Sequence, residues 1–298
     1  MNDFENIISE FFDEYLVNSI KKHAALIDIN AIFKHNYENP PANLNIGGGP
    51  SFLQKGWVNL ESIWSSRNPI PFHIEQGKPF PFADNSFERV YWSHNIEHLW
   101  PDVVEWVLKE VSRILKPGGR IVLLLPDYDS VLEHYRKGDK KYMYTPATCG
   151  FGWVIKYWKN LGIPDTLAYR SANVFVQWQN PQWGSPMAIY TGTAPPKCRD
   201  GYVGPPRMPE EQIDELLMNE RPSKIAKVMR EFVLKNEKKP FIHHISAWDR
   251  GELRDMLTPH GFTSFDFNRE TVFNDNHDIL GIENNYNFST FLSAKIGN

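Results

Sequence analysis

From about residue 43 onward, the hydrophobic positions of this chain form two kinds of pattern, short continuous runs and longer stretches with helical spacing. Short apolar runs, typical of strands that are buried on both faces, occur at 43–46, 57–60, 89–92 and 120–125. Between them, apolar residues spaced by three and four predict an amphipathic helix over 102–115. The residues Lys116-Pro117-Gly118-Gly119 end this helix, because proline cannot continue it and glycine adopts the reversed backbone conformation. Strands that alternate with helices at this spacing predict an open α/β sheet.

The pattern divides the chain into three parts. Residues 1–141 begin with an amphipathic helix and contain the strands described above. Residues 142–240 are rich in aromatic side chains and proline, which predicts an inserted cap or substrate subdomain with helices at 209–220 and 222–236. Its aromatic side chains form either a small core of their own or a pocket wall that stacks on the acceptor. Residues 241–298 return to the α/β pattern, with a helix over 249–257 and strands over 262–267 and 288–296.

Composition excludes several classes of partner. The net charge of −4 and the pI near 6.2 provide no basic field, so we expect no nucleic-acid partner. No apolar segment approaches the ~18 residues that cross a bilayer, so we expect no membrane partner. Cys149 and Cys198 lack metal-ligand spacing, and the N-terminus is acidic. These features predict a reduced, soluble, cytoplasmic protein.

A glycine loop follows the first predicted strand. Gly47, Gly48 and Gly49 would let a ligand lie against bare backbone, and the second strand ends in Glu61, where an acid can accept hydrogen bonds from a ribose. Phe52 occupies the position of the third glycine of a dinucleotide-binding motif. The sequence therefore predicts a nucleotide-like cofactor pocket that does not hold a nicotinamide dinucleotide, and a loop that only turns is the alternative.

Five motifs resemble, in order and spacing, those of S-adenosylmethionine-dependent class I methyltransferases. They read NIGGG at 45–49, GWVNLE at 56–61, PFPFADNSF at 79–87, SHNIEH at 93–98, and LKPGGR at 115–120 followed by PD at 126–127. The similarity covers about 43–135 and 243–296, and it points to the small-molecule and surface-polysaccharide branch. It implies a Rossmann-like sheet of seven strands, an aromatic-rich cap inserted after the fifth strand, and S-adenosylmethionine as the cofactor.

The resemblance implies a role for particular residues. The glycine loop would lie against the amino-acid portion of the cofactor, Glu61 would hold the ribose hydroxyls, and Glu75 would meet the adenine edge. Ser93 and His94 would border the sulfonium and the acceptor. The expected cofactor-binding residues are Asn45, Gly47, Gly48, Gly49, Glu61, Glu75, Gln76, Ser93 and His94.

Methyl transfer requires in-line placement of the acceptor, exclusion of water and, for a hydroxyl acceptor, a base. Histidine suits this role because its unperturbed pKa of about 6.5 leaves it mostly neutral at pH 7. The candidate catalytic residues are His94, His98, Asp127 and His244, and for each the alternative is a satisfied core or rim residue. We expect transfer to an oxygen or nitrogen of a small molecule such as a sugar or nucleotide-sugar.

The cluster of His94, Glu97 and His98 has two interpretations. In the favoured one, Glu97 and His98 lie in the first helical turn after a strand and pack beneath the cofactor. In the other, a continuous helix places His94 and His98 on one face with Glu97, and the three residues bind a divalent metal ion.

Some 2′-O- and catechol-type methyltransferases resemble this metal-binding arrangement, with Glu-x-x-Glu-His and a later histidine as ligands. Here His94 replaces the first glutamate, and His243 or His244 would be the later ligand. A histidine-rich set favours zinc, manganese or iron over magnesium. A metal-assisted enzyme that uses the same cofactor pocket and a non-catalytic S-adenosylmethionine-binding module are therefore alternative functions.

Overall fold

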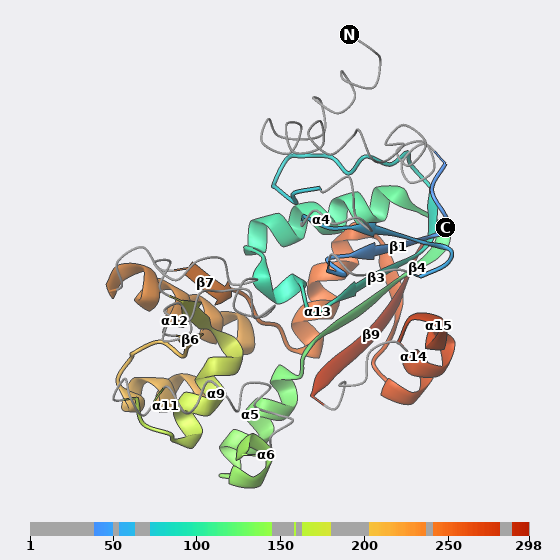
Figure 1. Ribbon diagram of the computed structural model, residues 1–298. Helices are drawn as coiled ribbons and strands as arrows, with labels where there is room; N and C mark the ends of the chain where they lie inside the picture. Colours follow the sequence, from blue (N-terminus) through green and yellow to red (C-terminus); the bar gives the residue numbers. More distant parts are fainter. Residues whose placement is uncertain are drawn as a thin grey trace.

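The computed structural model of this chain describes residues 39–49, 54–62, 72–144, 158, 163–179, 203–236, 241–280 and 288–297 (Figure 1). Several features of the sequence analysis lie outside these residues. They are the N-terminal helix, Phe52, both cysteines, and some of the aromatic residues of 142–240, such as Trp153, Tyr157, Trp183 and Tyr190. No helix among the described residues is both long and apolar enough to span a bilayer.

The main sheet has six strands within the described residues. In spatial order they are β2 (Trp57–Leu60), β1 (Asn43–Ile46), β3 (Phe87–Ser93), β4 (Leu115–Pro126), β9 (Ser289–Ile296) and β8 (Phe262–Asp266). β1 pairs in parallel with β2 and β3, and β3 with β4, whereas β9 is antiparallel to both β4 and β8. The predicted α/β sheet is confirmed. A seventh strand is not among the residues described.

Helices cover both faces of this sheet. Alternate side chains of β4 point to opposite faces: Leu123 joins the larger core cluster, while Leu124 joins a smaller one that includes Val272 and Ile279. The second face is covered by α14 (Arg269–Asp275) and α15 (His277–Leu280), and the first by α4 (Pro101–Ile114) and α13 (Arg250–Leu257), which is joined to η6 (Thr258–His260) (Figure 1). Burial on both faces explains why the strands read as continuous apolar runs.

The α4 helix ends where the sequence predicts. Its buried side chains, which include Val104, Val107, Leu108 and Val111, lie along one face. The backbone becomes extended at Leu115, where β4 begins, and Gly118 within β4 has a φ of +75°, at the point where the pairing of β4 with β3 is irregular.

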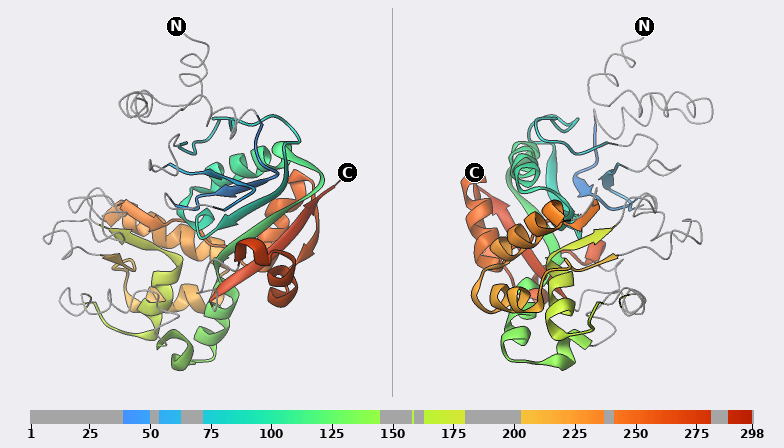
Figure 2. Two further views of the ribbon diagram at one scale, coloured as in Figure 1. Left: turned by 45° about the vertical axis from the view of Figure 1, so that its right-hand side comes forward. Right: turned by 90° about the vertical axis from the view of Figure 1, so that its left-hand side faces the viewer.

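A second sheet lies beside the main one, at the lower left of Figure 1 and alongside it in both views of Figure 2. It has the order β6 (Val203–Gly204), β5 (Gln177–Gln179), β7 (Phe241–His244), and all its pairs are antiparallel. The helices grouped with it are α5 (Tyr128–Arg136), α6 (Lys140–Tyr144), α9 (Leu167–Phe175), α11 (Glu210–Asn219) and α12 (Pro222–Asn236). β7 begins one residue beyond the boundary that the sequence suggested for the insertion.

Three aromatic side chains of residues 142–240 belong to the core. Trp158, Tyr169 and Phe175 are buried in the same hydrophobic cluster as the main sheet. The expected separate small core is therefore, for these three residues, a continuation of the main core. The inserted segment and the main sheet are stabilised by the same burial of apolar surface.

A buried carboxylate fixes the segment that enters β3. Glu110 on α4 accepts a hydrogen bond from the backbone amide of Phe80 (2.7 Å) and pairs with Arg113 (2.7 Å). Arg113 in turn donates to the carbonyl oxygens of Phe80 and Phe82. This network holds 80–84 against α4 and so sets the start of β3.

Removing this carboxylate should destabilise the fold. We expect Glu110→Ala to lower the free energy of unfolding by about 2–3 kcal/mol, because it leaves the buried Phe80 amide and a partly buried guanidinium without their acceptor. Lys109→Ala, at an exposed position of the same helix, should change it by less than about 1 kcal/mol. Urea unfolding followed by circular dichroism measures both changes, and equal losses would contradict the role given to Glu110.

Candidate cofactor and catalytic site

The carboxyl ends of four neighbouring strands bring the predicted site residues to one edge of the main sheet. β2 ends before Glu61, β1 before Gly47, β3 at Ser93 and β4 before Asp127. Ile46 pairs with Leu60 on one side and with Trp92 on the other, so the glycine loop lies between the ends of β2 and β3. Open α/β sheets bind their ligands at this edge.

The glycine loop is held by its neighbours on both sides. The Gly47 amide donates to the Leu60 carbonyl (2.9 Å), and the Gly49 amide donates to Glu61 Oε2 (2.8 Å). Gly47 and Gly49 have φ values of +67° and +77°. A Cβ on Gly48 would lie 1.8 Å from Asn45 Nδ2, whereas a Cβ on Gly49 would meet no atom within 4 Å. The loop is thus closely packed at Gly48 and open at Gly49.

Two asparagines that the sequence analysis did not single out support this loop. Asn59 accepts a hydrogen bond from Asn45 Nδ2 (3.3 Å) and donates to the Gly49 carbonyl (3.0 Å). Asn95 lies so close to Gly47 that a Cβ there would be 2.5 Å from its Cγ. Both were visible as polar residues inside predicted motifs, but only the pairing of β1 with β2 and β3 brings them to the loop.

Glu61 is well placed to bind hydroxyl groups. The residue is 8% exposed, and its Oε1 accepts a hydrogen bond from Ser62 Oγ (3.1 Å) while Oε2 holds Gly49. A carboxylate has about four lone-pair directions, so each oxygen can accept a further hydrogen bond. Glu61 can therefore hold ribose hydroxyls without releasing the loop.

Glu75 and Gln76 lie farther along the same edge. The Phe72 amide donates to the Glu61 carbonyl (2.8 Å), which brings the segment after 72 beside the end of β2. Both side chains are exposed in a turn that the Lys78 amide closes onto the Glu75 carbonyl (3.3 Å). Their predicted contact with adenine stays a prediction.

His94 forms a hydrogen-bonded relay at the end of β3. Its Nδ1 lies 3.2 Å from Glu97 Oε1 and its Nε2 lies 2.8 Å from Ser289 Oγ. An ionised carboxylate only accepts hydrogen bonds, so Nδ1 carries the proton and Nε2 presents its lone pair to Ser289. The His94 side chain is 39% exposed. This arrangement can accept a proton from a ligand hydroxyl at the sheet edge.

Glu97 is a buried charge. The residue is 1% exposed. Burial raises its pKa, but the hydrogen bond with His94 and the neighbouring imidazoles of His98, His94 and His244 outweigh this effect and lower the pKa to about 2. Among the described residues, its Oε2 has no hydrogen-bond partner. An ionised, partly unsatisfied carboxylate therefore lies directly behind His94.

Asp127 has a structural role. It caps the N-terminus of α5, accepting from the Ser130 amide (3.1 Å) and from Ser130 Oγ (2.8 Å). Thr290 Oγ1 also donates to it (3.2 Å). With three acceptor contacts already made, this carboxylate is better suited to ordering the β4–α5 junction than to taking a proton. Its predicted catalytic role stays a prediction.

The histidine cluster differs from the helical arrangement considered above. The 3-10 turn η3 (Ile96–His98) begins after His94, whose φ is +44°, so His94 and His98 do not share the face of a continuous helix. Instead His98 meets His243 and His244, and ligand nitrogens of these three residues lie within 4.8 Å of one another. Burial, with the neighbouring histidines, lowers the pKa of His243 to about 2 and that of His244 to about 4, so both are neutral at pH 7.

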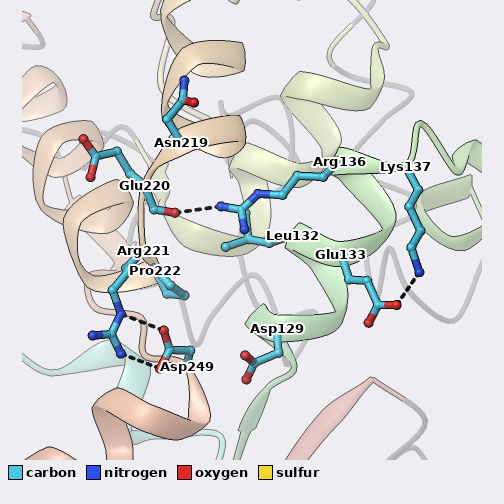
Figure 3. A pocket seen from close by; sticks show the side chains of 10 residues that line it. All are labelled: Asp129, Leu132, Glu133, Arg136, Lys137, Asn219, Glu220, Arg221, Pro222 and Asp249. Carbon is cyan, nitrogen blue, oxygen red and sulfur yellow. Dashed lines mark hydrogen bonds and ion pairs between the residues drawn. The ribbon is translucent and has the colours of Figure 1, made fainter.

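A separate cavity of about 550 Å³ opens between α5 and the segment from Asn219 to Pro222 (Figure 3). Four of its charged side chains form two ion pairs, Arg221 with Asp249 and Lys137 with Glu133. None of the expected cofactor-binding residues lines it. We therefore assign the candidate site to the edge of the main sheet.

Residues 56–123 match the family described as "Methyltransferase domain". This segment runs from β2 to the middle of β4 and includes Glu61, His94 and Glu97. The chain is 50% identical over 44 residues to the uncharacterised protein YafE of Escherichia coli strain K12, which is 15% of this chain and 20% of that protein. It is 42% identical over 55 residues to the ubiquinone/menaquinone biosynthesis C-methyltransferase UbiE of Desulfotalea psychrophila, 18% of this chain and 22% of that protein. These matches span only about a fifth of each relative.

A solved structure of a SAM-dependent methyltransferase from Methanosarcina mazei aligns with 91% of this chain and 98% of its own, at 15% identity and a TM-score of 0.39. At these values the alignment carries no argument about function. The sequence match covers β2, β3, η3 and most of β4, and it does not include β1 or the glycine loop. Residues 56–123 of this chain therefore carry the sequence of a methyltransferase domain.

Proposed function

We propose that this protein is an S-adenosylmethionine-dependent methyltransferase that acts on an oxygen or nitrogen of a small molecule. The observation that carries the proposal is the hydrogen bond between the Gly49 amide and Glu61, which joins the ends of β1 and β2 into one unit. Glu61 belongs to the segment that matches the methyltransferase domain, and the glycine loop adjoins it in space. A loop that only turned would need neither the open face at Gly49 nor a buried acid at its end.

The described residues fit such a cofactor. S-adenosylmethionine supplies a methyl group that is already activated on a sulfonium. The backbone of 47–49 would hold its amino-acid portion, and Glu61 would orient its ribose. Catalysis by the remaining residues consists of placing the acceptor, excluding water and moving a proton.

The His94 relay supports an oxygen acceptor. A hydroxyl loses its proton during methylation, and His94 Nε2 is a neutral acceptor whose ring is oriented by Glu97 at 3.2 Å. Ser289 Oγ, at 2.8 Å from Nε2, marks the position from which a hydroxyl group can donate to it. A sugar or nucleotide-sugar is the acceptor class that we propose, because it presents several such hydroxyls.

A second function has one observation in its favour. The meeting of His98, His243 and His244 supports a metal-assisted reaction that uses the same cofactor pocket. A non-catalytic binding module is the third possibility that the sequence leaves, and turnover across a panel of hydroxyl and amine acceptors separates it from both enzymes.

The first prediction concerns the open face of the glycine loop. Gly49→Val should abolish binding of S-adenosylmethionine and of S-adenosylhomocysteine in calorimetry, because its side chain fills the space that the ligand needs. Gly138→Val is the matched control: Gly138 also has a positive φ (+67°) and also has no atom within 4 Å of its Cβ position. Both variants should lose a similar amount of stability from backbone strain.

The two variants separate strain from ligand contact. Loss of binding in Gly49→Val alone supports the assigned pocket. An equal loss of cofactor binding in both variants would refute the proposed function. Failure of the wild-type protein to bind either compound would refute it as well.

The second prediction concerns the base. His94→Gln should lower kcat about 10²- to 10⁴-fold for a hydroxyl acceptor and leave the Kd for S-adenosylhomocysteine within about twofold of wild type. His134→Gln removes another imidazole paired with a carboxylate, Asp139 at 2.8 Å, and should leave kcat unchanged. A His94→Gln enzyme with normal kcat would show that no base acts at this position.

A further inference from the structure

Three histidines from distant parts of the chain converge beside the proposed active site. His98 belongs to η3, which follows β3 of the main sheet, and His243 with His244 ends β7 of the second sheet. The ring centroids lie 4.3 Å apart for His98 and His243, 5.0 Å for His98 and His244, and 5.5 Å for His243 and His244. His98 meets each of the other two rings edge to face, and His243 and His244 are stacked.

A β-bulge brings the two consecutive histidines together. In a regular strand, His243 and His244 would point to opposite faces of the sheet. Here Gln177 pairs with His244 and Trp178 pairs with Ile242, so His243 is an extra residue opposite β5. A bulge redirects a side chain locally, and this one lets both rings approach His98.

Backbone carbonyl groups fix the tautomers of two of the rings. His98 Nδ1 lies 2.6 Å from the His243 carbonyl oxygen, and His244 Nδ1 lies 2.8 Å from the Val174 carbonyl oxygen. A carbonyl oxygen only accepts, so each Nδ1 carries the proton and each Nε2 keeps its lone pair. Metal-binding histidines are usually oriented by a hydrogen bond of this kind.

A buried negative charge lies next to the three rings. Glu97 Oε1 is 3.9 Å from His98 Nε2, and Oε2 has no hydrogen-bond partner among the described residues. A buried carboxylate oxygen without a hydrogen-bond donor is costly, and a cation bound at the cluster, or a water on that cation, would satisfy it. This carboxylate is the second, independent feature that points to a cation at the cluster.

We propose that His98, His243 and His244 bind one divalent transition-metal ion, with zinc as the expected ion. Three imidazole ligands suit zinc, copper, iron or nickel, and not magnesium or calcium, which prefer oxygen. Nitrogens bound to tetrahedral zinc lie ~3.3 Å apart, so the rings need only a small rotation from their spacing of up to 4.8 Å. His94 is outside the set because both its ring nitrogens already bond Glu97 and Ser289.

The ion would have two effects. It would join η3 of the main sheet to β7 of the second sheet, and three protein ligands would leave a fourth position for water or a ligand oxygen. Metal binding does not depend on methyl transfer and is tested separately from it.

Zinc binding by the full chain is the direct test. Protein treated with a chelator and dialysed should bind about one equivalent of zinc in competition with a chromophoric chelator. We expect His243→Gln and His244→Gln to weaken the affinity at least tenfold to a hundredfold, and His134→Gln, which changes an imidazole on α5, to leave it unchanged. Far-UV circular dichroism shows whether the variants remain folded.

A measurement on wild-type protein alone removes the dependence on variants. Cobalt added to the chelator-treated protein should give the intense visible bands of a four-coordinate site, and zinc, but not magnesium, should abolish them. The proposal is wrong if cobalt gives no such bands, or if the protein takes up no zinc in competition with the chelator. It is also wrong if folded His243→Gln and His244→Gln proteins bind zinc with the affinity of the wild-type protein.

Discussion

The short turn η3 connects the two sheets, and the rest of the site depends on it. The Glu97 carbonyl accepts hydrogen bonds from the amides of Ile245 (2.7 Å) and Ser246 (3.1 Å), and His98 donates to the His243 carbonyl. Ser246 Oγ returns a hydrogen bond to the Leu99 carbonyl (2.8 Å). Ile245 and Ser246 follow β7 and are outside the sheet. The contacts with η3 give their buried backbone amides the hydrogen-bond acceptor that a neighbouring strand would otherwise supply. The segment after β7 is thereby fixed against the carboxyl end of β3.

Burial of Glu97 follows from this docking. The turn that presents its carbonyl to 245–246 also buries its side chain, and His94 Nδ1 donates a hydrogen bond to the carboxylate in place of the lost water. One residue thus orients the proposed base and supplies the charge beside the histidine cluster. A residue without an acceptor oxygen at this position would leave His94 Nδ1 without its hydrogen-bond partner.

The glycine loop obeys a different constraint. The loop follows β1, which pairs in parallel with β2 on one side and β3 on the other. The carboxyl ends of all three strands are therefore at the same edge, and polar side chains from the ends of β2 and β3 reach the loop. Asn59 and Glu61 hold Gly49 from one strand, and Asn95 limits Gly47 from the other. The glycine loop is therefore held in place by hydrogen bonds from its neighbours, which suits the proposed role of placing a methyl group in line with its acceptor.

The sequence by itself determined the α/β alternation, the end of α4 at the Pro-Gly-Gly motif, the glycine loop and the acid at Glu61. Each of these follows from local physics: apolar periodicity, the restricted backbone of proline, the freedom of glycine and the position of a residue at a strand end. Only the tertiary structure decided that the Asp127 carboxylate caps a helix and that Asn59 and Asn95 support the loop. It also decided that His98 meets His243 and His244. The last grouping depends on a bulge in β7 and on contacts across about 145 residues of sequence, as between His98 and His243, and no local pattern in the chain encodes either.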